Sequence, residues 1–115
     1  MAQEKKIDLY KKVAITSAGK LPSIVLLVDR AVILLKEARE DDEKRQANII
    51  KTQNILAQLE RALDFDAGDV AGSLFFIYDY LFAELNNRDD QALDTATKML
   101  GELQETFKKI GKKEK

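Results

Sequence analysis

Three aspartates around one glycine are the residues of this sequence best suited to bind a cation. Asp64, Asp66 and Asp69 flank Gly68. Hard cations prefer such carboxylate oxygens, but a calcium loop alternates its ligands at fixed positions and closes with a bidentate Glu, which this segment lacks. The same residues suit a helix boundary, because Gly68 can adopt the left-handed conformation that ends a helix and Asp69 can cap the next one. We therefore interpret the cluster as a turn and expect no metal site.

Catalytic side chains are scarce. Tyr78 and Tyr80 could act as acids or bases, but the chain has no histidine and no cysteine to work with them. A di-iron bundle needs Glu-x-x-His pairs and a phosphotransfer bundle needs a histidine. The sequence also lacks a glycine-rich phosphate loop and a G-x-S-x-G elbow. We expect a protein that is not an enzyme and has no cofactor.

Length and charge narrow the class of protein further. The 115 residues suffice for one domain, and the net charge of −1 gives no field to attract nucleic acid. No apolar run approaches the roughly 18 residues of a membrane span, and the polar first ten residues do not resemble a secretion signal. We expect a cytoplasmic protein with no nucleic-acid partner and no stable membrane insertion.

The pattern of apolar residues predicts long helices. Five glycines and one proline leave too few breaks for a β-sandwich or barrel. The first long helix is expected from Pro22 to about Glu40, and its stretch from Ile24 to Leu35 is apolar except at Asp29 and Arg30. A charged turn follows, in which Asp41 or Asp42 could cap a second helix, over about residues 44–63.

Two further helices complete the pattern. The third, over about residues 70–87, carries a core stripe and a second apolar stripe beside it. The core stripe is Val70, Leu74, Ile77, Leu81 and Leu85, and the second is Ala71, Phe75, Tyr78 and Phe82, flanked by Phe76 and Tyr80. The fourth begins after Asp89 or Asp90 and presents one seam, Leu93, Ala96, Leu100, Leu103, Phe107 and Ile110.

Four helices joined by short turns predict an all-α fold, an antiparallel four-helix bundle. We expect the bundle over residues 21–111, after an N-terminal arm over residues 1–20 that is either extended or a short helix capping the bundle's groove. A frayed basic tail is expected over residues 112–115. The first and third helices carry more apolar surface than one core needs. Either both are central helices, or part of this surface binds a helical or extended partner segment.

The order of motifs resembles the flagellin export chaperone family, FliS, over Tyr10 to Ile110. The strongest match is Ile77-Tyr78-Asp79-Tyr80-Leu81, preceded by Asp69-Val70-Ala71-Gly72-Ser73-Leu74 and followed by Leu85, Asn86 and Asp89. Residues 47–56 and 59–63 are similar to the family's second long helix, and Leu27-Val28-Asp29-Arg30-Ala31 is similar to a motif in its first.

The resemblance implies a cytosolic chaperone that holds the disordered C-terminal segment of flagellin, which prevents premature polymerisation and keeps flagellin competent for export. It further implies that the arm, with Tyr10, lies over the binding groove and moves aside for flagellin. We expect the flagellin contacts on the first and third helices to be Ile24, Leu27, Val28, Ala31, Tyr78 and Leu81, together with Tyr10. Export-gate components or a co-chaperone are possible further partners. The alternative is a structural helical bundle that forms homodimers or serves as an adaptor through the same apolar face.

Overall fold

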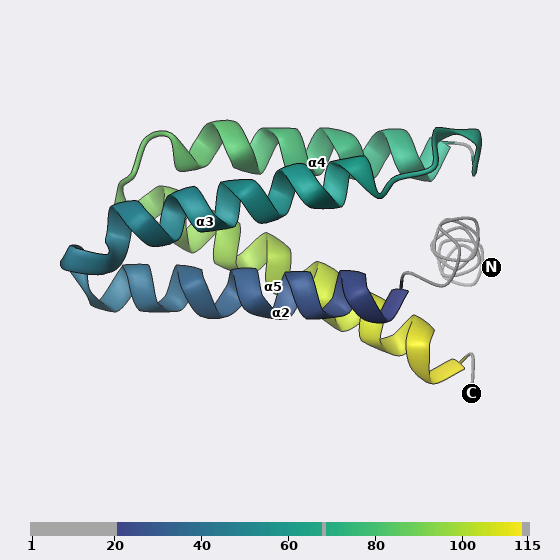
Figure 1. Ribbon diagram of the computed structural model, residues 1–115, viewed down its shortest axis with the longest axis horizontal. Helices are drawn as coiled ribbons and strands as arrows, with labels where there is room; N and C mark the ends of the chain where they lie inside the picture. Colours follow the sequence, from purple (N-terminus) through teal and green to yellow (C-terminus); the bar gives the residue numbers. More distant parts are fainter. Residues whose placement is uncertain (1–20, 68, 114–115) are drawn as a thin grey trace.

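The computed structural model describes residues 21–67 and 69–113, and it arranges them as a bundle of four long helices without a strand (Figure 1). The helices are α2 (Leu21–Glu40), α3 (Asp42–Arg61), α4 (Asp69–Leu85) and α5 (Asp90–Lys113), and a short 3-10 helix, η1 (Phe65–Ala67), precedes α4. The predicted all-α four-helix bundle is confirmed. The arm over residues 1–20 lies outside the described residues. Helix α5 continues through Lys113, past the expected end of the bundle at residue 111.

Consecutive helices run antiparallel around the bundle (Figure 1). Helix α2 packs against α3 and α5 along its length, and α4 packs against α3 and more sparingly against α5. Helices α2 and α4 are therefore diagonal to each other, and both begin at the same end of the bundle. This placement means that α2 and α4 face each other across the core and do not form a continuous outer surface.

Aspartate side chains set the helix boundaries, as N-capping requires. The Asp41 carboxylate accepts a hydrogen bond of 3.0 Å from the Glu43 amide, so Asp41 is the cap of α3 and separates it from α2 by a single residue. The Asp89 carboxylate accepts one of 2.8 Å from the Ala92 amide at the start of α5. Before that cap, Arg88 adopts the left-handed conformation, with φ of 58°.

The aspartate cluster near residue 68 forms a turn. The Asp64 carboxylate accepts a hydrogen bond of 2.9 Å from the Asp66 amide, and Asp69 is the first residue of α4 rather than the residue before it. The expected role of Gly68 falls outside the described residues. Among the residues that the structure describes, no three potential ligand side chains gather in a way that could hold a metal ion.

The core consists of leucine-rich stripes from all four helices. Helix α5 buries every residue of its predicted seam, and α3 buries Ile49, Leu56 and Leu59. A buried polar residue stabilises the pairing of α2 and α3, because Asn48 of α3 donates a hydrogen bond of 3.0 Å to the Leu34 carbonyl of α2. The buried Thr52 hydroxyl is satisfied within α3, where it donates a hydrogen bond of 2.8 Å to the Asn48 carbonyl. No described helix is both long enough and apolar enough to cross a bilayer.

Candidate protein-binding surface

Helix α4 carries aromatic side chains on the face that points away from the core. Its buried stripe is Ala71, Leu74, Tyr78, Leu81 and Leu85. Four other aromatic residues stay exposed, from Phe76 with 74% of its surface accessible to Phe82 with 37%; the other two are Phe75 and Tyr80. An ordinary bundle helix has charged and polar residues on this face. Helix α4 therefore presents apolar surface that the bundle itself does not cover.

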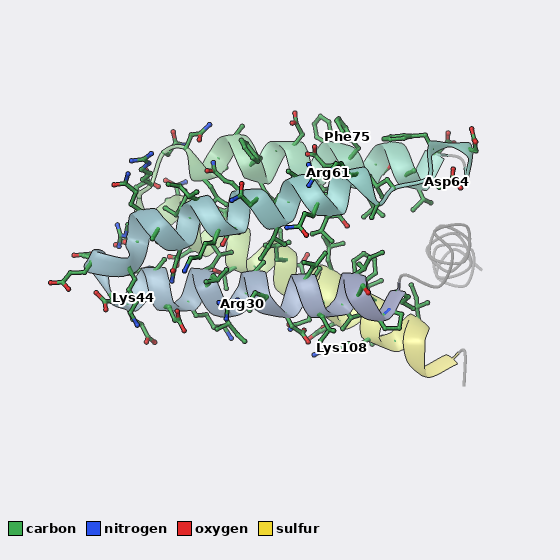
Figure 2. The ribbon with its side chains drawn as sticks, in the orientation of Figure 1. Arg30, Lys44, Arg61, Asp64, Phe75 and Lys108 are labelled. Atoms are coloured by element: carbon green, nitrogen blue, oxygen red, sulfur yellow. The ribbon has the colours of Figure 1, made fainter. Side chains whose placement is uncertain are left out.

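A fifth aromatic residue extends this surface beyond the helix. Phe65 of η1 is more than half exposed and packs edge-to-face on Phe75, with ring centroids 5.8 Å apart and planes at 64°. Such pairs are stabilising beyond the area that they bury. Figure 2 shows Phe75 projecting from α4 away from α2. The aromatic surface is defined here as Phe65, Phe75, Phe76, Tyr80 and Phe82.

One edge of the aromatic surface runs along the contact between α3 and α4. Gln53 of α3 donates hydrogen bonds of 3.0 Å to the Phe82 carbonyl and 2.8 Å to the Asn86 side-chain oxygen. Further along α3, burial raises the pKa of the half-buried Glu60 carboxyl, and the negative charge of Asp79 on α4 adds to this rise. The edge therefore combines exposed phenylalanines with two carboxylates close enough to repel each other.

The predicted contact residues lie at several depths. Val28, Ala31, Tyr78 and Leu81 are fully buried, with at most 1% of their surface accessible. Ile24 and Leu27 are half-buried against the edge of the core near the start of α2. Tyr10 lies outside the described residues. The structure brings the four buried residues together in the core of the bundle, where a partner reaches them only if the helices move.

Sequence reasoning named the exposed aromatic residues of α4 without assigning them to the contact surface. The expected core stripe was partly wrong: Leu74, Leu81 and Leu85 are buried, but Val70 and Ile77 are only half-buried. From the second stripe, Ala71 and Tyr78 are buried, whereas Phe75 and Phe82 are exposed. One signal in the sequence could have predicted that the outer face of α4 is apolar. After Asp69, helix α4 has only two charged residues, Asp79 and Glu84, and no lysine or arginine, so no strip of charge is available to cover its outer side.

The comparison with protein-family models shows which family the chain belongs to. The model described as flagellar protein FliS matches residues 1–114. The chain belongs to the FliS family. This is the family of flagellin-specific export chaperones, so the bundle has the role of a flagellar export chaperone. The comparison with curated proteins found no match.

Proposed function

We propose that this FliS-family bundle binds the disordered C-terminal segment of flagellin on its exposed apolar surface, which prevents premature polymerisation and keeps flagellin competent for export. The observation that supports this most directly is the aromatic surface on α4. A monomeric protein gains little from exposing five aromatic residues together, whereas a binding site for an apolar segment requires them. We further propose that the complex forms in the cytoplasm, without a cofactor and without catalysis.

A flexible segment suits a surface spread over several helices. A disordered chain that orders on binding can cover about 1,000–3,000 Å², and the cost of ordering keeps release feasible. The half-buried Ile24 and Leu27 lie on α2 at the end of the bundle where α4 also begins. In this proposal the segment contacts these two residues and the aromatic surface, while Val28, Ala31, Tyr78 and Leu81 shape the surface from below.

The N-terminal arm is the proposed regulator of access. The described chain begins at Leu21, at the end of the bundle where α4 starts. We propose that the arm covers part of the binding surface through Tyr10 and is displaced by flagellin. Its docking then lowers the apparent affinity for flagellin by the fraction of molecules in which the surface is covered.

The function is tested by calorimetric titration of full-length flagellin and of flagellin without its C-terminal segment. We expect binding of the first and loss of binding of the second. Equal affinity for the two would refute the proposed mechanism. Size-exclusion chromatography with light scattering tests the rival function, because a tight dimer without flagellin supports a structural or adaptor bundle, and a monomer that shifts only with flagellin supports the chaperone.

The surface is tested by a pair of matched double variants. Phe75→Ser with Phe76→Ser removes exposed apolar area from α4, and Leu26→Ser with Ile33→Ser removes it from the outer face of α2, where the two residues are 68% and 49% exposed. We expect the α4 variant to lose most of its affinity for flagellin and the α2 variant to keep it. Equal effects of the two variants would show that flagellin does not prefer the aromatic surface.

A further inference from the structure

Glu60 and Asp79 lie on the edge between α3 and α4, where Glu60 is the second-to-last residue of α3. The hydrogen bonds of Gln53 to Phe82 and Asn86 fix the relative position of the two antiparallel helices. Glu60 lies seven residues after Gln53, hence on the same side of α3, and two turns back along α4 from Phe82 and Asn86 are Phe75 and Asp79. The helix register therefore places Glu60 beside Asp79, in agreement with the electrostatic effect of Asp79 on Glu60.

Among the residues that the structure describes, no basic side chain forms an ion pair with either carboxylate. The ion pairs of the described residues join Arg39 and Arg45 to acids at one end of the bundle and Lys108 to Asp29, and none of them includes Glu60 or Asp79. Arg61 follows Glu60 directly in the sequence, but in the described part of the chain it forms no ion pair with Glu60 or Asp79. Helix α4 itself contributes no basic residue.

The charged form of Glu60 is unfavourable for the free bundle, first because Glu60 is half-buried and second because Asp79 carries a like charge. Because the pKa of Glu60 is higher in the folded protein than its ordinary value, the charged form of Glu60 lowers stability at pH values above that ordinary value. A glutamine at position 60 would avoid the unfavourable charge. A like-charged pair on a binding surface is instead expected where the partner brings the compensating charge.

Exposed aromatic residues lie on either side of the carboxylates. Phe75 and Phe82 are seven residues apart on α4, about 10 Å along the axis, and Asp79 lies between them. A partner helix along this edge would place two apolar residues, about seven positions apart, on the phenylalanines. A residue three or four positions from each of them would then face the carboxylates.

We propose that Glu60 and Asp79 bind a lysine or arginine of the flagellin segment, and thereby set the register of an amphipathic helix whose apolar residues contact Phe75 and Phe82. This inference rests on the proposed function, because it takes the flagellin segment as the occupant. It adds a chemical requirement to that function: the bound helix has an apolar residue, a basic residue near the midpoint, and a second apolar residue about two turns after the first.

A second copy of the chain fits this edge less well. Two copies joined by a twofold axis through the α3–α4 edge would bring two Glu60 and two Asp79 side chains into one interface, without a basic residue from either α4. Like charges opposed across an interface are strongly unfavourable. The edge is therefore suited to a partner with positive charge.

The test removes the charges and keeps the shapes. Glu60→Gln with Asp79→Asn is titrated with a synthetic flagellin C-terminal segment, and we expect affinity to fall about tenfold or more, as for hydrogen bonds to charged groups. Glu40→Gln with Glu102→Gln is the matched control, because it changes the net charge equally at two exposed acids on α2 and α5. We expect this control to keep its affinity, and an equal loss in both variants would overturn the inference in favour of long-range attraction.

A second measurement separates recognition from a structural role. Glu60→Gln should leave the melting temperature unchanged or raise it, while the affinity for the segment falls. A variant that loses stability and affinity together would contradict the inference. In the opposite experiment, Asp79→Lys should bind the wild-type segment poorly, and replacing one basic residue of the segment with glutamate should restore binding. If none of these replacements restores binding, the inference is also contradicted.

The outcomes separate the inference from the proposed function. Loss of affinity in Phe75→Ser with Phe76→Ser but not in Glu60→Gln with Asp79→Asn overturns the charge recognition and leaves the chaperone surface in place. Full affinity in both variants overturns the surface itself. A wild-type protein that forms a tight dimer through the α3–α4 edge, with no binding of the flagellin segment, overturns both.

Discussion

The Gln53 side chain donates a hydrogen bond of 2.8 Å to the side-chain oxygen of Asn86, and this pair fixes how α3 lies against α4. The same amide group donates to the Phe82 carbonyl at 3.0 Å, so one side chain contacts the last turn of α4 and the residue that directly follows the helix. This position of α3 places Glu60 beside Asp79 and leaves Phe75 and Phe82 at the exposed edge. The geometry of the proposed binding surface therefore depends on Gln53.

Gln53→Ala should lower the free energy of unfolding by about 0.5–1.5 kcal/mol, the usual net contribution of a hydrogen bond. Urea denaturation measures the change. Gln58→Ala on the exposed side of α3 is the control and should be close to neutral. If the two variants have the same stability, Gln53 does not hold the two helices in register.

Leu74→Ala should lower stability by about 2–5 kcal/mol, because Leu74 is buried in the core and its truncation leaves a cavity. Phe76→Ala on the same helix removes a larger but exposed side chain and should change stability by less than about 0.5 kcal/mol. Thermal or urea unfolding of the two variants compares them. A larger loss in Phe76→Ala than in Leu74→Ala would mean that the buried face of α4 has been assigned incorrectly.

Asp29→Asn should lower stability in a manner that depends on pH. A hydrogen bond from Gln104 at 2.5 Å, and an ion pair with Lys108 at 3.2 Å, hold the pKa of Asp29 below its ordinary value against the opposing effect of burial. A lowered folded-state pKa stabilises the protein above the unfolded-state pKa, about 3.9, and this contribution disappears as pH falls through the folded-state pKa.

Urea denaturation at neutral pH and at about pH 2–3 tests this effect. The difference between wild type and Asp29→Asn should be largest at neutral pH and should shrink on acidification. A difference that stays constant or grows in acid would contradict the assignment of the charge effect to Asp29.

Tyr10→Ala should leave the melting temperature nearly unchanged while altering the affinity for the flagellin C-terminal segment. In the sequence Tyr10 belongs to none of the predicted apolar stripes, and we propose that it contributes to covering the binding surface. Calorimetric titration and thermal unfolding of the same sample check the two expectations. A large loss of melting temperature would make Tyr10 an ordinary core residue and would remove its proposed role in access.

The sequence predicted α5 well and the outer face of α4 poorly, for a physical reason. Helix α5 has one apolar seam among polar residues, so only one orientation buries it, and all six residues of that seam are buried. Helix α4 is apolar on nearly all sides, and its periodicity allows several orientations. The neighbours α3 and α5 decide between them, and their contacts depend on residues such as Gln53 that show no hydrophobic pattern.

The expected contact residues show the same limitation. Val28 and Ala31 lie in a helix segment that is apolar except at two positions, and sequence periodicity could not separate core from surface there. In the structure α2 is covered by both α3 and α5, so these two residues are buried. The helix caps were predicted more closely, to within one residue. The sequence allowed Asp41 or Asp42 before α3 and Asp89 or Asp90 before α5. The hydrogen bonds from the Glu43 and Ala92 amides identify Asp41 and Asp89 as the caps.

Site-specific photo-crosslinking to flagellin tests the binding surface most directly. A photo-reactive amino acid replaces Phe76, the most exposed residue of the aromatic surface, and in a second protein it replaces Arg30 on the exposed side of α2. We predict that position 76 crosslinks to the C-terminal segment of flagellin and that position 30 does so weakly or not at all. A complex that forms normally but crosslinks from position 30 and not from position 76 would contradict the account.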